Sequence, residues 1–127
     1  AGSEGNTLVL LEITDFDGLQ ARFGALAADN VLSLVAGVLR RKIRDADHVG
    51  RLSDGRFGLL LTQCGLDDAR LKAAWLCRHL ALSSFQYQDQ IVPIYLAAGL
   101  APFGRGHTSE TLIAAAASDL GAHIGLA

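Results

Sequence analysis

The chain has 127 residues, half of them apolar, and a formal net charge of −2. This length suits one domain with its own hydrophobic core. No apolar stretch is long enough to cross a membrane, so the sequence predicts a soluble cytoplasmic domain without membrane contact. The chain is nearly neutral apart from four basic residues between positions 40 and 44, a distribution that argues against a nucleic-acid partner.

Two cysteines, Cys64 and Cys77, belong to no CxxC pair and lie at no metal-ligand spacing from a histidine. Two ordinary buried thiols in a reducing cytosol are therefore a better interpretation than a disulfide or a zinc site. Residues 1–6 are small and polar, and we expect them to be a linker or a remnant of cloning. Residues 7–127 are expected to form the single domain.

The first half of the chain begins with a nearly continuous apolar run at residues 7–13, which predicts a central strand covered on both faces. A short helical turn is expected at 19–23. Apolar residues then recur at the helical period over 27–43, so a long helix is expected there. Its last turns are basic, which suits the negative end of a helix dipole.

A hairpin is expected next, because strand-like runs at 48–52 and 57–62 flank the turn formers Ser53-Asp54-Gly55-Arg56. The second half of the chain is predicted to contain a long helix, two strands and an alanine-rich helix, at residues 66–82, 85–87, 91–98 and 109–122. Pro93 is expected to place an irregularity or an edge position in the second of these strands. Trp75, on the long helix, is expected to lie in the core rather than at an interface.

This order of elements predicts an α+β fold with a ferredoxin-like βαββαβ core and an extra hairpin. The central sheet would be mainly antiparallel, with the helices packed on one side of it.

Carboxylates gather where metal chemistry would need them. Asp15 and Asp17 follow the first strand, a common place for ligands of hard cations, and Asp54 in the hairpin turn is the acid that would join them. Phosphoryl chemistry with two metals needs several carboxylates that converge on Mg²⁺. Asp is also common in solvated turns, and we favour that interpretation. No metal or other cofactor is expected, and Mg²⁺ enters only if the catalytic alternative below holds.

Several ordered stretches resemble the GGDEF (diguanylate cyclase) family, over residues 8 to about 123. They are the end of the first strand, Phe23-Gly24 with 28–32, the run from Arg44 to Asp47 with Arg51-Leu52, Phe57 in the hairpin, and 97–101. The resemblance implies that the βαββαβ core is of the nucleotide-cyclase type. It also implies a bacterial cyclic di-GMP signalling protein, with neighbouring sensory and phosphodiesterase (EAL) domains and self-association as a homodimer.

The hairpin departs from the family's signature, Gly-Gly-Asp/Glu-Glu-Phe. Counting back from Phe57, the two glycines become Ser53 and Asp54, the metal-binding acid becomes Gly55, and the next glutamate becomes Arg56. Side chains in place of the glycines impede close approach of substrate to the backbone. A cation beside the site repels Mg²⁺.

These changes lead us to expect a degenerate, catalytically inactive domain that acts as a regulatory or interaction module. One alternative is a working cyclase that converts two GTP to cyclic di-GMP with the metal set Asp15, Asp17 and Asp54. The other is a domain that binds GTP without turnover and acts allosterically.

One motif of the family is intact: Arg44 and Asp47 keep the Arg-x-x-Asp spacing of its inhibitory site, which binds cyclic di-GMP. Arginine can pair with phosphate or guanine, and aspartate can accept from guanine N–H groups. Alternatively, Arg44 merely ends a basic helix and Asp47 begins a turn. Asp29 matches a guanine contact of the family, whereas a further arginine of the inhibitory site is matched by Trp75.

Overall fold

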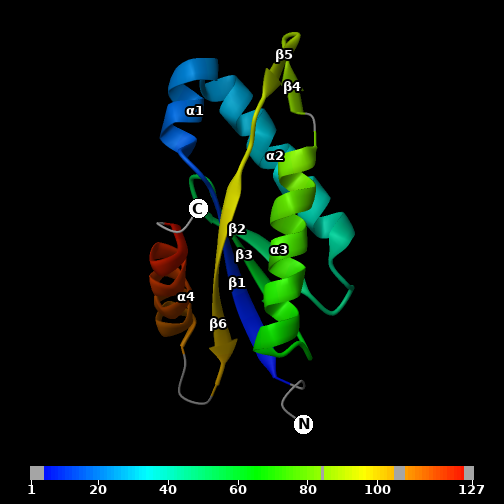
Figure 1. Ribbon diagram of the computed structural model, residues 1–127, viewed down its shortest axis with the longest axis vertical. Coiled ribbons are helices and arrows are strands. Elements are labelled where there is room, and N and C mark those ends of the chain that lie inside the picture. The colour runs from blue at the N-terminus through cyan, green and yellow to red at the C-terminus, as the bar shows by residue number, and fades with distance from the viewer. Residues whose placement is uncertain (1–4, 84, 105–107, 125–127) are drawn as a thin grey trace.

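The structure is a computed structural model that describes residues 5–83, 85–104 and 108–124, without the side chains of 121–124. Most of the expected linker, and the expected domain end at 125–127, lie outside the described residues. In chain order the elements are β1 (Asn6–Ile13), α1 (Phe16–Phe23), α2 (Ala25–Lys42), β2 (His48–Ser53), β3 (Arg56–Leu61), α3 (Leu66–Leu82), β4 (Phe85–Tyr87), β5 (Gln90–Val92), β6 (Leu96–Phe103) and α4 (Ser109–Ile124) (Figure 1).

The main sheet has the strand order β2-β3-β1-β6, and every neighbouring pair is antiparallel. β1 lies between β3 and β6 because its apolar run can be buried on both faces. Its register places Glu12 opposite Arg56 on β3 and opposite Ala97 on β6. The predicted α+β fold with a βαββαβ core is confirmed.

Helices cover both faces of the sheet, so the expectation that they pack on one side is wrong. One face carries Val9 and Leu11 of β1 in a core shared with α2 and α3, and the other carries Leu10 in a core shared with α4. In Figure 1 the sheet lies between α4 and the pair α2 and α3. α4 approaches β6 closely at Gly99, where an added Cβ would lie 2.1 Å from the carbonyl oxygen of Ala116.

The strand predicted at 91–98 is two separate strands. β5 ends at Val92, and β6 begins at Leu96 and runs on to Phe103. Pro93 between them has no N–H to give to a ladder, so pairing is interrupted there. β4 and β5 form their own hairpin, which Figure 1 shows at one end of the molecule.

α3 has the predicted bounds, but Trp75 is 41% exposed, so its predicted core position is wrong. The buried side of α3 consists of Ala69, Ala73, Leu76 and Leu80. The two cysteines are unpaired and partly buried, and burial raises the pKa of Cys77 to about 11. None of the described helices is both long and apolar enough to span a bilayer.

Candidate functional site

The hairpin turn is built around a glycine that no other residue would easily replace. Gly55 is buried and has φ +77°, a left-handed conformation that favours glycine. Its carbonyl oxygen accepts a hydrogen bond from the amide of Ile13 at 2.8 Å, which ties the turn to the end of β1. A Cβ added to Gly55 would lie 2.9 Å from the Cβ of Phe16. Behind the turn, the side chain of Phe57 is fully buried in the core.

An ion pair joins the turn to the central strand. The Nε of Arg56 donates to Oε1 of Glu12 at 2.8 Å, and the two side chains are 37% and 26% exposed. Both residues lie at the same level of the sheet, because β1 and β3 pair Glu12 with Arg56. The position that the family fills with a glutamate is therefore occupied by a cation that engages the nearest carboxylate.

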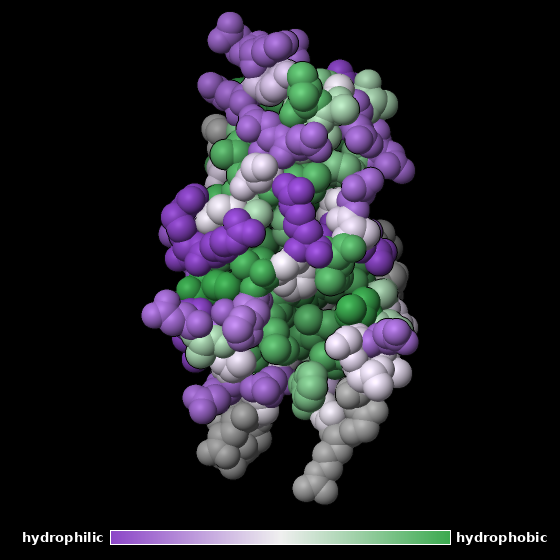
Figure 2. All heavy atoms as spheres, turned by 180° about the vertical axis from the view of Figure 1, so that it is seen from behind, coloured by the Kyte–Doolittle hydropathy of each residue, from purple (hydrophilic) through white to green (hydrophobic). Residues whose placement is uncertain are grey.

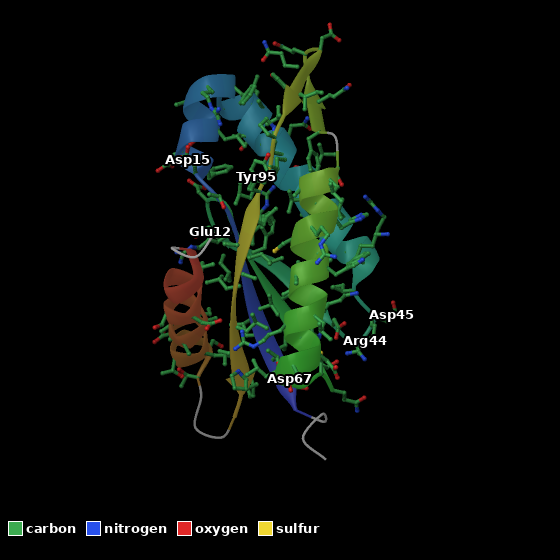
Figure 3. All side chains as sticks on the ribbon, in the orientation of Figure 1. Glu12, Asp15, Arg44, Asp45, Asp67 and Tyr95 are labelled. Atoms are coloured by element: carbon green, nitrogen blue, oxygen red, sulfur yellow. The ribbon has the colours of Figure 1, made fainter. Side chains whose placement is uncertain are left out.

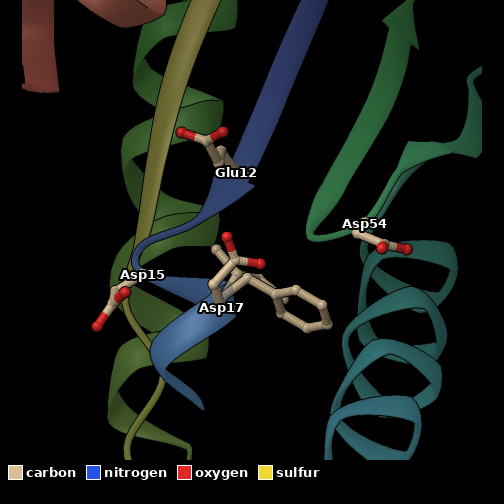
Figure 4. Close-up of a pocket in the computed structure, with 6 residues that line it drawn as sticks. Glu12, Asp15, Asp17 and Asp54 are labelled. Atoms are coloured by element: carbon tan, nitrogen blue, oxygen red, sulfur yellow. The ribbon is translucent and has the colours of Figure 1, made fainter. Parts of the chain in front are cut away.

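A cleft of about 250 Å³ lies beside this ion pair and is lined by Glu12, Ile13, Asp15, Phe16, Asp17 and Asp54. The structure thus brings the three sequence-predicted acids to one cleft. In Figure 4, however, the carboxylates of Asp15 and Asp54 point away from each other, with Asp17 between them. Among the residues that the structure describes, no three His, Cys, Asp or Glu side chains form a group that could hold a metal ion.

Asp15 has a structural task of its own. It is the N-cap of α1, and its side chain accepts a hydrogen bond from the amide of Gly18 at 3.2 Å. This bond satisfies one of the free N–H groups at the start of the helix. Asp29 lies on α2 with an exposed side chain and does not line the cleft. Asp15 is thus engaged as a helix cap, and Asp29 lies apart from the acids of the cleft.

Arg44 and Asp47 form a second cluster, at the junction between α2 and β2. The Nε of Arg44 lies 3.2 Å from Oδ2 of Asp47, and a terminal guanidinium nitrogen lies 3.2 Å from Oδ1. The Asp47 carboxylate also accepts from the backbone amides of Arg44 at 3.1 Å and of Thr62 at 2.9 Å. Arg44 in turn donates to the carbonyl oxygen of Thr62. This network fastens the junction to the end of β3.

The two partners of this cluster differ in exposure. The side chain of Asp47 is 2% exposed, whereas that of Arg44 is 58% exposed. Burial raises the pKa of the Asp47 carboxyl, but hydrogen bonds from Arg44 and Thr62 outweigh that effect and hold the pKa below its usual value. The hydrogen bond with Asp47 raises the pKa of Arg44. Asp47 is therefore held as a carboxylate whose oxygens are already occupied.

A second cleft, of about 290 Å³, opens beside this cluster and is lined by Arg44, Asp47, Leu61, Gln63, Cys64, Asp68 and Lys72. Figure 3 shows Arg44 and Asp45 well away from Glu12 and Asp15, so the two candidate sites are separate. Arg44 and Asp47 thus border a cleft that also offers the cation of Lys72.

Two participants, Glu12 and Thr62, are not among the residues that the sequence pattern singles out. Glu12 lies within the apolar run of the first strand and is the single acid there. Its position directly before the loop of Asp15 and Asp17 was the available signal. Thr62 carries no such signal, because its contact with Asp47 spans fifteen residues and depends on how β2 and β3 pair.

The family model described as the GGDEF domain of diguanylate cyclases matches residues 3–122. Diguanylate cyclase DgcP of Pseudomonas aeruginosa is 30% identical over 105 residues, which is 83% of this chain and 16% of that relative. The chain therefore spans about a sixth of the relative's length.

Solved structures agree in fold. The structure of diguanylate cyclase SiaD of Pseudomonas aeruginosa, in complex with its activator SiaC, matches this chain with a TM-score of 0.88 at 20% identity. The match covers 96% of this chain and 47% of the SiaD chain. The GGDEF domain of DgcB from Caulobacter crescentus, in complex with c-di-GMP, matches with a TM-score of 0.86 at 17% identity. The match covers 94% of this chain and 72% of the solved DgcB chain. With a family model over nearly its whole length, the chain belongs to the GGDEF family of diguanylate cyclase domains.

Proposed function

We propose that this GGDEF domain is catalytically inactive and acts as a regulatory or interaction module of a bacterial cyclic di-GMP signalling protein. The observation that carries the proposal is the ion pair between Arg56 and Glu12, 2.8 Å apart at the edge of the acidic cleft. In an active member of the family this position of the turn is acidic, and the cleft binds Mg²⁺ with the triphosphate.

The charge of Arg56 acts against a metal site in two ways. It repels a divalent cation directly, and it occupies an oxygen of Glu12, the carboxylate nearest to it in the sheet. Gly55, which takes the place of the metal-binding acid, contributes no side chain. The remaining acids of the cleft are one helix cap, Asp15, and two exposed residues, Asp17 and Asp54. This set of residues does not fit Mg²⁺.

The turn backbone supports the same proposal. An acid at position 55 would need a left-handed conformation, and its Cβ would lie 2.9 Å from the Cβ of Phe16. The backbone and the packing at this position are suited to glycine, so a single substitution would not restore the metal-binding acid of the family. The backbone conformation of the turn therefore supports the proposal that the metal-binding acid is lost.

A second candidate function is binding of cyclic di-GMP at Arg44 and Asp47. The cleft of about 290 Å³ beside this pair, with Lys72 at its wall, favours it. The exposed guanidinium of Arg44 is the group that would meet a phosphate or a guanine edge. Asp47, whose oxygens are occupied within the chain, would hold Arg44 in place rather than bind the ligand.

Incubation of the purified domain with GTP and Mg²⁺, with product detection by liquid chromatography, tests the main proposal. We expect no cyclic di-GMP, while an active diguanylate cyclase in a parallel reaction produces it. Formation of cyclic di-GMP would instead support the alternative with Asp15, Asp17 and Asp54 as Mg²⁺ ligands. Tight GTP binding without product would favour the allosteric GTP-binding alternative.

Calorimetry with cyclic di-GMP tests the second candidate. Binding by the wild type that is lost in Arg44→Ala but kept in Arg22→Ala, on another helix, would support it. No heat of binding with the wild type would dispose of it. In the full-length protein we expect the domain to be cytoplasmic, to contact neighbouring sensory and EAL domains, and to dimerise, with no nucleic-acid or membrane partner.

A further inference from the structure

An apolar stripe on the outward side of α3 is left largely uncovered. Leu71, Trp75 and Leu82 are 72%, 41% and 78% exposed. With Arg78 they stand at positions i, i+4, i+7 and i+11, the spacing by which one helix packs along another. The buried side of α3 is a different set of residues. These four residues, the α3 stripe, therefore give the helix a second packing face.

Trp75 is held in place by its neighbours. Its ring stacks on that of His79, with centroids 5.0 Å apart and planes inclined by 7°. The ammonium groups of Lys72 and Lys42 lie 5.3 and 5.9 Å from the indole centroid. Lys72 also donates to the carbonyl oxygen of Lys42 at 2.7 Å, which links α3 to the end of α2. An aromatic side chain that is already oriented loses less entropy when a partner docks on it.

The charge beside the stripe is one-sided. In the heptad that places Trp75 and Leu82 at equivalent seam positions, Lys72 and His79 both flank the seam on the same side. Lys42 of α2 adds a second ammonium group there, beside that of Lys72. On the other flank the equivalent positions are Asp67, Ala74 and Ala81, so no positive charge lies there. Helix pairs select their partners by opposite charges at these flanking positions, so the stripe suits a helix with carboxylates on one flank.

We propose that the α3 stripe docks an amphipathic helix of a partner protein, whose apolar seam is flanked by Asp or Glu on the side that faces Lys42 and Lys72. The inference rests on the proposed function and deepens it, because it names the surface through which the interaction module takes its partner. Figure 2 shows the molecule from behind the view of Figure 1; on that face hydrophobic area is concentrated in the lower half and hydrophilic side chains are concentrated in the upper half.

The test uses Trp75 as its own reporter, because it is the only tryptophan of the chain. The probe is a synthetic three-heptad peptide with Leu at the seam and Glu at the flanking positions. Its control is the same peptide with Lys in place of Glu. At low ionic strength, we expect a saturable blue shift of the Trp75 emission with the Glu peptide. Two exposed ion pairs make its binding roughly fivefold tighter than that of the Lys peptide.

Charge reversal supplies the matched variants. Lys72→Glu on α3 and Lys42→Glu on α2 are each expected to shift the preference towards the Lys peptide. Arg22→Glu on α1 is expected to leave the preference as in the wild type. Agreement between the two lysine variants, which lie on different helices, guards against a local misfolding effect in either one.

Other occupants of the α3 stripe would give different results in these measurements. The absence of a saturable change in emission, or equal affinity for both peptides, would overturn the proposal. So would a concentration-dependent dimer that Leu71→Ser abolishes in sedimentation, or binding of Trp75 to phosphatidylglycerol vesicles in place of the peptide. Production of cyclic di-GMP from GTP would overturn the proposed function without altering these peptide results, so the two failures are distinguishable.

Discussion

Arg56 and Glu12 face each other across the β1–β3 ladder with their charged atoms 2.8 Å apart. The family's turn carries a glutamate at the position of Arg56, so in this chain an attraction between opposite charges takes the place of two neighbouring acids. The pair places the cation of the turn against the acid at the end of the central strand.

A double-mutant cycle measures this attraction. Removing Arg56 leaves the half-buried carboxylate of Glu12 without its partner, and removing both residues removes the interaction altogether. We expect Arg56→Ala, Glu12→Ala and the double variant to give a coupling energy of about 0.5–1 kcal/mol in urea denaturation. A coupling energy within error of zero would show that the pair contributes nothing to the fold.

Gly55→Glu tests whether the lost acid could simply return. The new side chain would take a left-handed backbone and meet Phe16, so we expect the free energy of unfolding to fall by about 1–3 kcal/mol. Gly50→Ala is the control, because a Cβ there has nothing within 4 Å and needs no left-handed backbone. Equal stability of Gly55→Glu and the wild type in urea denaturation would contradict the account of the turn.

The lowered pKa of Asp47 should make the free energy of unfolding depend on pH. Its pKa is lower in the folded chain than in the unfolded one, so the ionised form stabilises the fold above the unfolded pKa of about 4. This contribution is lost as the pH falls through the lower, folded-state pKa. Below pH 4 we therefore expect a steeper loss of unfolding free energy in the wild type than in Asp47→Asn.

The matched control for that experiment is Asp45→Asn, since Asp45 is exposed and two residues away. It should leave the acid limb of the stability profile as in the wild type. An Asp47→Asn profile that runs parallel to the wild type at every pH would refute the assignment of the carboxylate as a clamp.

Gly99→Ala tests the close approach of α4 to β6. Its Cβ would lie 2.1 Å from the carbonyl oxygen of Ala116 and 2.5 Å from the amide nitrogen of Leu120, both backbone atoms that cannot move alone. We expect a loss of about 2–3 kcal/mol of unfolding free energy by thermal or urea denaturation. A variant as stable as Gly50→Ala would mean that α4 packs less closely than described.

Periodicity in the sequence was enough to predict β1 and α3, because a continuous apolar run and a stripe at the helical period each have one structural interpretation. It could not assign α4 to a face of the sheet, since an apolar helix side suits either face. The predicted core position of Trp75 is wrong for a related reason. α3 carries apolar residues on two sides, and the sequence alone does not say which side the sheet covers.

The candidate site likewise has features that the local sequence indicates and features that depend on the fold. The sequence offers Asp15, Asp17 and Asp54 as a joint metal set only as the alternative to three solvated turn residues; in the structure all three line one cleft. The partner of Arg56 and the network of Asp47 depend on strand register and on Thr62, which local pattern does not encode.

The most direct test of the account is the rate of cyclic di-GMP formation from GTP and Mg²⁺ by the wild-type domain and by Asp54→Asn. Asp54 is the one acid in the turn and carries no structural bond among the described contacts, so its replacement should leave the fold intact. We predict no product from either protein at any Mg²⁺ concentration. Product from the wild type that Asp54→Asn abolishes would contradict the central claim and assign the cleft to catalysis.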